Sequence, residues 1–176
     1  MKKLLLPLAV LGIAVPAMAS AVPANVTGTV TIDGSVAPRC QFTTGTATIT
    51  IPELSDTSTG VLDPTTVAGK NANLVGWCNG TKSTMTANAT SLTNGTTPPP
   101  GFSNQVDFTA TATANGQSSI DSDSTDGLAG TTAMVGIFSG NINVALSAAA
   151  THGGSTLKLV AGAYTGSVLV TLAPAN

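Results

Sequence analysis

The alternating run from Ser167 to Leu172 constrains the fold more than any other feature of the sequence. Val168, Val170 and Leu172 lie on one side of an extended chain, and the residues between them lie on the other. This period of two, rich in β-branched residues and closed by Pro174, predicts a β-strand. Because the strand lies so close to the C-terminus, we expect the chain to end inside a sheet.

A second long alternating run, from Val22 to Ile32, lies near the other end of the chain. Its odd-numbered positions are mostly polar, and its even-numbered positions are apolar or small. The residues that share this apolar face are Val22, Ala24, Val26, Gly28, Val30 and Ile32. The run predicts a second extended segment that needs a partner for one face.

The first 19 residues have the three parts of an export signal. Lys2 and Lys3 form a basic start, Leu4 to Val15 is apolar, and Ala17-Met18-Ala19 is a cleavage site of small residues. A retained membrane anchor is the alternative, but the apolar run is shorter than the roughly 20 residues that span a bilayer. We therefore expect an exported protein with its signal removed and no membrane span afterwards.

The charge balance argues against nucleic-acid binding. Six basic residues face eight acidic ones, and removal of Lys2 and Lys3 makes the net charge about −4. The basic residues that remain are Arg39, Lys70, Lys82 and Lys158. They are scattered along the chain, whereas binding to phosphates needs clustered cations.

Cys40 and Cys78 are the only cysteines, and both follow the signal. In an oxidising compartment an even pair predicts a disulfide; two buried free thiols are the alternative. Two cysteines and one distant histidine are too few for a typical metal site, so we predict no metal or other cofactor.

Between these features the sequence predicts short strands separated by turns rich in Gly, Pro and Asn, without sustained helical periodicity. We expect loops over 53–73 and 117–130. The expected strands are 44–51, 74–78, 84–90, 106–112, 132–138 and 142–148. This pattern favours an all-β, immunoglobulin-like antiparallel β-sandwich.

No group of residues forms a recognisable catalytic constellation. His152 precedes two glycines in a loop, and no serine lies in a G-x-S-x-G elbow. The segment from Asp121 to Gly127 is similar to a calcium loop, but its third acid falls one residue late and Thr132 stands where such loops carry a bidentate Glu. We therefore expect no enzyme, and we interpret the segment as a solvated loop, with calcium binding as the alternative.

Three features together resemble chaperone–usher pilins, the subunits of bacterial surface fimbriae, especially the spore-coat-U-like and archaic branch. The first is Gly28-Thr-Val-Thr-Ile-Asp-Gly-Ser-Val36 followed by Cys40. The second is Cys78 in the sequence LVGWCNG, and the third is the closing segment from Ala161 to Leu172.

The resemblance implies a sandwich that lacks its final strand. A periplasmic chaperone and an outer-membrane usher handle such subunits, and the N-terminal extension of a neighbouring subunit then fills the open groove. Mapped onto this sequence, 1–19 is the signal, 20–30 the donor extension and 31–176 the pilin-like domain. The donor residues are Val22, Ala24, Val26, Gly28 and Val30, with Gly28 facing a shallow pocket. The acceptor-groove strand carries Val168, Val170 and Leu172.

The resemblance implies export through the periplasm to the cell surface, as a fimbrium, or secretion, with a role in adhesion or biofilm formation. Two alternatives stay open. In the first, residues 22–32 pair within their own chain, which gives a self-complete exported binding module for carbohydrate or a surface. The second is a secreted hydrolase. Few aromatic residues are present to stack on a sugar, since Trp77 and Tyr164 are the only Trp and Tyr.

Overall fold

The computed structural model describes residues 24–176. The predicted signal peptide and Val22 lie outside this range. Residues up to Ser35 separate from the rest of the chain as a unit of their own. Residues 24–35 have no regular secondary structure, and their side chains are exposed.

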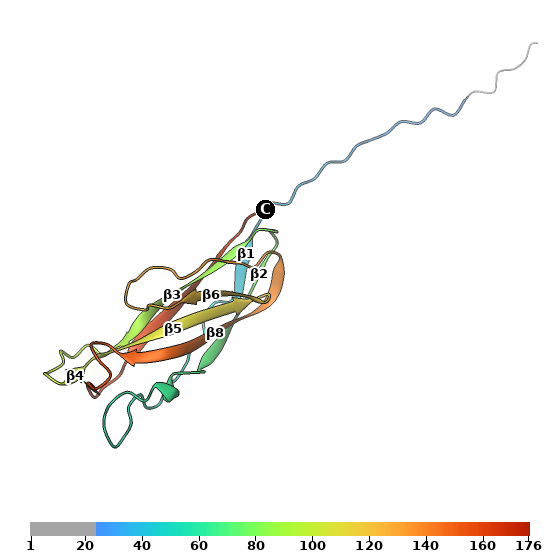
Figure 1. Ribbon diagram of the computed structural model, residues 1–176. Coiled ribbons are helices and arrows are strands. Elements are labelled where there is room, and N and C mark those ends of the chain that lie inside the picture. Colours follow the sequence, from blue (N-terminus) through green and yellow to red (C-terminus); the bar gives the residue numbers. More distant parts are fainter. Residues whose placement is uncertain (1–23) are drawn as a thin grey trace, which may run out of the picture. The chain divides into compact units, whose positions relative to one another are not determined.

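The second unit, from Val36 onward, is almost entirely antiparallel β-structure (Figure 1). Its strands are β1 (Cys40–Thr44), β2 (Asn71–Cys78), β3 (Thr84–Thr93), β4 (Phe102–Ser103), β5 (Gln105–Ala114), β6 (Gln117–Asp121), β7 (Ala133–Met134), β8 (Phe138–Thr151), β9 (Lys158–Leu159) and β10 (Thr165–Ala173). One short 3-10 helix, η1 (Pro64–Thr66), interrupts the loop before β2.

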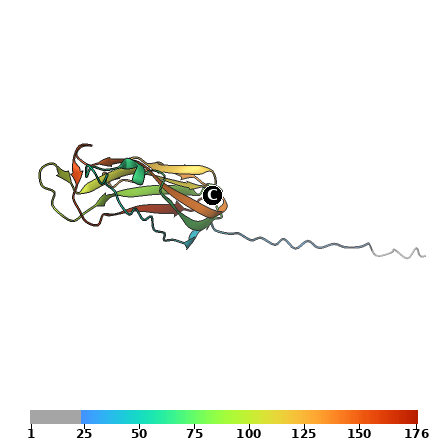
Figure 2. The same cartoon turned by 90° about the horizontal axis from the view of Figure 1, so that it is seen from below.

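The main sheet has the strand order β1-β2-β8-β5-β3-β10, with β6 paired to β5 and β7 to β3. The ladder between β5 and β3 has only two residue pairs, Leu92 with Val106 and Thr93 with Gln105. Because this seam is short, β3 and β10 fold over the face of β2, β8 and β5 (Figure 2). The predicted antiparallel sandwich is confirmed.

Small and β-branched residues that alternate along the strands form the core. Along β5 every second residue is buried, from Val106 to Ala114, as the TATATA repeat of the sequence requires. One cluster joins Met85 and Ala87 of β3 to Ile142 of β8 and Val170 of β10. A second cluster lies around Phe108 and Leu146.

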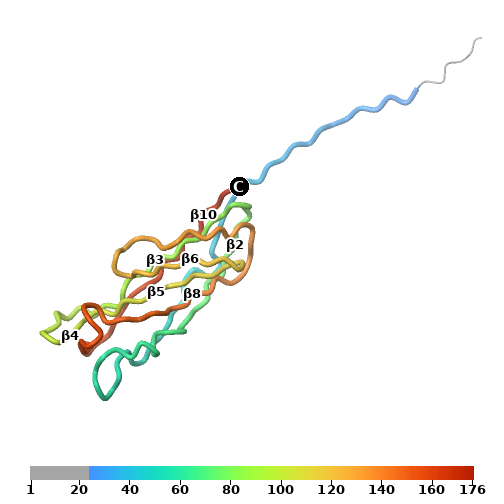
Figure 3. The backbone as a smooth tube through the Cα atoms, in the orientation of Figure 1, coloured from blue at the N-terminus to red at the C-terminus, as the bar shows by residue number. Residues whose placement is uncertain are grey.

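The predicted disulfide is present between Cys40 and Cys78, which are opposite each other in the β1–β2 ladder. It joins β1 to β2 at the end of the sandwich where β10 finishes. Pro174, just after β10, lines the same surface hollow as Pro38 to Gln41 and Trp77. The backbone tube in Figure 3 shows β10 running to this end.

Besides the strand expected over 132–138, of which only β7 (Ala133–Met134) forms, two further sequence-based expectations were wrong. The predicted strand over 44–51 does not form. β1 ends at Thr44, because the residues after it have no hydrogen-bonding partner in the described structure. The predicted loop over 117–130 begins with the strand β6, which pairs with β5 through a tight turn at Asn115-Gly116. Both differences bear on the site described next.

Candidate functional site

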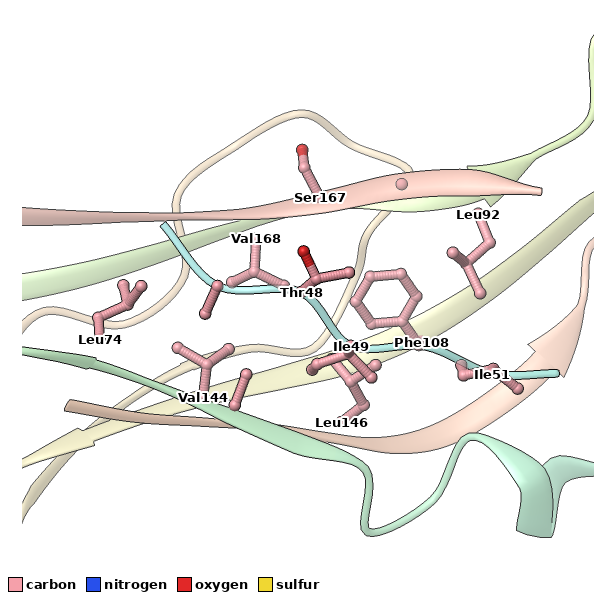
Figure 4. A pocket seen from close by; sticks show the side chains of 13 residues that line it. Thr48, Ile49, Ile51, Leu74, Leu92, Phe108, Val144, Leu146, Ser167 and Val168 are labelled. Atoms are coloured by element: carbon pink, nitrogen blue, oxygen red, sulfur yellow. The ribbon is translucent and has the colours of Figure 1, made fainter. Parts of the chain in front are cut away.

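An apolar cavity of about 280 Å³ opens between β10, β2 and β8 (Figure 4). Phe108, Val144 and Leu146 form its floor, and all three are buried in the described structure. The remaining lining residues are Ala47, Thr48, Ile49, Ile51, Ala72, Leu74, Leu92, Gly166, Ser167 and Val168. The core therefore reaches the surface along the first half of β10, where it remains uncovered.

One backbone edge of β10 lies beside this cavity without a partner. On its other edge β10 pairs with β3 over the length from Thr165 to Ala173. β10 is the last strand in the sheet order, so within residues 24–176 no strand pairs with its outer edge. An unpaired edge of this kind is a template for one more strand.

The opposite wall of the cavity is the segment 45–51, which we call the strap. Ala47, Ile49 and Ile51 line the cavity, with Ile49 and Ile51 half-buried against the Phe108 cluster. Within the described part of the chain, no backbone hydrogen bond involves a residue of the strap. The strap thus has the residue pattern of a strand and lies extended beside the core, but its polar groups have no protein partner.

A second hollow, of about 480 Å³, continues the cavity past the start of β10. Ile49, Ile51 and Leu92 line both spaces, so the two hollows are neighbours, and we refer to them together as the groove. Glu53 and Tyr164 lie at its outer end. Hydrogen bonds from Ser55, backbone N–H and hydroxyl alike, lower the pKa of the Glu53 carboxyl, whereas burial raises the pKa of Tyr164.

The predicted acceptor residues occupy three different positions. Val168 lines the groove, Val170 is 7% exposed within the core, and Leu172 packs half-buried against the first cluster. Sequence reasoning missed the strap as the facing wall, and it missed Leu92, Phe108 and Leu146. Phe108 and Leu146 belong to the alternating strands expected over 106–112 and 142–148, but nothing local in the sequence says that the core is open above them.

The predicted donor residues are exposed wherever the structure describes them. Val26 is 95% and Val30 85% exposed, and Ala24 and Gly28 are exposed as well. Val22 lies outside the described residues.

His152 and the hydroxyl of Ser91 are linked through one carboxylate. Its Nδ1 lies 2.9 Å from Asp107 Oδ2, and Ser91 Oγ donates to Asp107 Oδ1 at 2.9 Å. The serine and the histidine thus bind the same carboxylate, whereas nucleophilic catalysis needs the histidine between the serine and the carboxylate. These hydrogen bonds join β5 to β3 and to the residue that follows β8.

The calcium-like segment after β6 uses its acids for local structure. Asp121 is only 3% exposed, and its carboxylate accepts from the backbone N–H groups of Ala89 at 2.7 Å and Asp123 at 3.1 Å. Asp123 and Asp126 accept from Thr125 and Leu128 in tight turns. Among residues 24–176 no three His, Cys, Asp or Glu side chains are grouped as metal ligands.

We predict that Asp121→Ala lowers the free energy of unfolding by about 1–3 kcal/mol, because it leaves the buried N–H of Ala89 without an acceptor. Urea denaturation followed by tryptophan fluorescence measures this. Asp123→Ala, which removes an exposed carboxylate two residues away, is the matched control and should have a much smaller effect. Equal effects of the two substitutions would contradict the structural role of Asp121.

Comparisons with protein-family models, with curated proteins and with solved structures each find no match to this chain. Among the described residues, no helix combines the length and the apolar character that crossing a membrane requires. The function is therefore argued from the geometry of the groove.

Proposed function

We propose that this protein is a structural subunit of a bacterial surface fimbria, acting in adhesion or biofilm formation, and that it polymerises by donor-strand exchange. The observation that supports this most is the groove itself. An apolar channel runs between β10, which has a free backbone edge, and the strap, whose backbone is unpaired. The natural occupant of such a channel is an extended segment.

A strand in this channel provides hydrogen-bonding partners for the backbone of both walls. Its backbone hydrogen bonds with β10 on one side and with the strap on the other, and its alternate side chains enter the cavity over Phe108 and Leu146. Backbone pairing supplies affinity, and the apolar side chains fix the register. The strap then becomes the strand that its sequence predicts.

Residues 20–30 of another copy have the properties of this occupant. They alternate, and they carry no charged side chain that the groove would have to desolvate. Val26 and Val30 are exposed in the described structure, and burying a valine side chain stabilises by roughly 1.5–3 kcal/mol. During export the same groove has to be shielded, which is the task that the resemblance assigns to a periplasmic chaperone before the usher.

Gly28 gives a direct test of the donor role. A Cβ added at Gly28 meets no atom within 4 Å in the structure of the single chain, so Gly28→Phe leaves that chain unstrained. Inside a packed groove, however, the ring overpacks a shallow position at a cost of about 1–3 kcal/mol. We expect polymerisation of the mature chain to slow about tenfold, measured by the growth of high-mass species in size-exclusion chromatography.

Thr29→Phe is the matched control for Gly28→Phe. We call residues 20–30 the tail. Thr29 lies on the opposite face of the tail from Gly28, and this face points toward solvent when the tail is inserted as a strand. The control should polymerise at nearly the wild-type rate. If Gly28→Phe assembled as fast as the wild type, the donor assignment would be wrong.

A further inference from the structure

We propose a second contact between neighbouring copies, which rests on the function proposed above: the end of one subunit that carries Arg39 docks on the end of the next that carries Glu53. The Arg39 end is the hollow lined by Pro38, Arg39, Cys40, Gln41, Trp77 and Pro174. The Glu53 end is the outer part of the groove, lined by residues 52–55 and 159–164.

The two ends lie at opposite ends of β10. Tyr164, which directly precedes β10, lines the Glu53 end, and Pro174, which directly follows it, lines the Arg39 end. A strand of this length spans about 30 Å at roughly 3.3 Å per residue. Arg39 and Glu53 of one molecule are therefore too far apart to pair with each other.

The groove is open at the Glu53 end and closed at the other. The two hollows that form it share Ile49, Ile51 and Leu92, so the channel continues outward past Glu53. At the Arg39 end the disulfide and the β1–β2 ladder close the sandwich, and the N–H of Lys82 donates to the carbonyl of Ala175. An inserted tail from another copy therefore leaves the groove beside Glu53.

The length of the linker keeps the two bodies close. If residues up to Val30 occupy the groove, residues 31–38 connect them to Arg39 of the donor molecule, and they span at most about 28 Å when fully extended. Arg39 is also fixed to its own body, because its N–H donates to Asn79 Oδ1 and its carbonyl accepts from the N–H of Asn79. The Arg39 end is thus the part of the donor body that meets the acceptor first.

The two surfaces are complementary in charge. Among the described residues the only ion pair is that of His152 with Asp107, so within residues 24–176 neither Arg39 nor Glu53 is in an ion pair. The N–H and the hydroxyl of Ser55 both donate to Oε1 of Glu53. Asp56, three residues after Glu53, adds a second carboxylate, and hydrogen bonds from Ser58 and Thr59 lower its pKa to about 2. Lys158, near Gly60, is the nearby cation.

The Arg39 end also offers contact area. Its hollow of about 310 Å³ combines the half-buried ring of Trp77 with Pro38 and Pro174. Aromatic and arginine side chains together are typical of the residues that dominate protein interfaces. Because assembly repeats the same pair of unlike surfaces, the contact is head-to-tail, and it generates an open filament when its rotation does not close a ring.

Carbodiimide cross-linking of the assembled protein tests the contact. Arg39→Lys keeps the positive charge and provides an amine that a carbodiimide joins to a carboxylate within contact distance. We expect polymers of this variant to yield an amide between residue 39 and Glu53, identified by mass spectrometry, and monomers to lack it. The double variant Arg39→Lys with Glu53→Gln is the control and should lose this product alone.

Charge reversal gives the second measurement. Arg39→Glu and Glu53→Arg should each slow polymerisation about three- to tenfold at low salt, and the two together should restore the rate to within twofold of the wild type. Polymers that form without the amide, and without any effect of reversal, would overturn this contact while leaving strand exchange intact. Failure of the wild-type chain to polymerise at all would overturn both proposals.

Discussion

Removal of residues 20–30 is expected to abolish self-assembly of the mature chain. The deletion takes away the apolar segment that fills a neighbour's groove, while the groove between β10 and the strap remains. Inserting this segment buries several apolar side chains and adds backbone hydrogen bonds on both sides, so its loss leaves little to hold a polymer together. Multi-angle light scattering should give the mass of a single chain under conditions in which the full mature chain forms polymers.

A synthetic peptide of residues 20–32 separates this account from simple misfolding of the shortened chain. We expect the peptide to bind the shortened chain and raise its Tm, because a ligand of the folded state stabilises it. The same peptide with Val26→Asp and Val30→Asp is the matched control and should neither bind nor stabilise. A shortened chain that still polymerised, or that gained nothing from the peptide, would disprove the donor role.

Replacing both Cys40 and Cys78 with Ala is expected to have the largest effect on stability. The two residues are 38 positions apart, and chain entropy for a loop of that size corresponds to about 4 kcal/mol of stabilisation, with measured cases ranging over 2–5 kcal/mol. Urea denaturation of the double variant measures the loss. A loss below about 1 kcal/mol would contradict it.

The disulfide also supports the groove. It holds β1 against β2, and the strap follows β1 directly without a backbone hydrogen bond of its own. Without the bond, only the β1–β2 ladder holds the start of the strap against the sandwich. We therefore expect the double variant to bind the tail peptide more weakly, even at temperatures at which it is folded; wild-type protein treated with reductant is the control and should behave in the same way.

The strand nearest the C-terminus was predictable because both requirements of a strand are met: its side chains alternate, and its backbone has a partner in the same chain. Val168, Val170 and Leu172 face the core, and β3 supplies a hydrogen-bonding partner within the same chain. The strap has equally good alternation through Ala47, Ile49 and Ile51, yet it is no strand in the structure. A residue pattern specifies which side chains face the core, but a strand also needs a backbone partner.

The loop expected after Asn115-Gly116 fails for a different reason. Residues 117–121 look polar, but Ser119 and Asp121 are buried and bind backbone N–H groups of β3, at Ala87 and Ala89. Their side chains thus replace ladder bonds that β3 and β5 do not make with each other. A polar side chain can be buried when it hydrogen-bonds to a buried backbone group, so polarity alone does not predict exposure.

The site was only partly predictable from the sequence. Alternation and the run of apolar residues identify Val168 and the two chain ends as strand-like, but the opening above Phe108 and Leu146 depends on the whole arrangement of strands. The groove lies beside the unpaired edge of β10, and no local residue pattern shows that an edge is left unpaired. The exposure of Val26 and Val30 suggests a donor role only once the opening above Phe108 and Leu146 is known.

Photo-cross-linking between isotopically distinct chains tests the central claim most directly. A benzophenone side chain placed at position 26 of heavy-labelled mature chain is mixed with unlabelled chain before assembly, and the products are analysed by mass spectrometry. The account predicts heavy–light products that join position 26 to residues 45–51 or 165–173. Products confined to position 26 and β10 of the same chain, from a protein that stays monomeric, would contradict it.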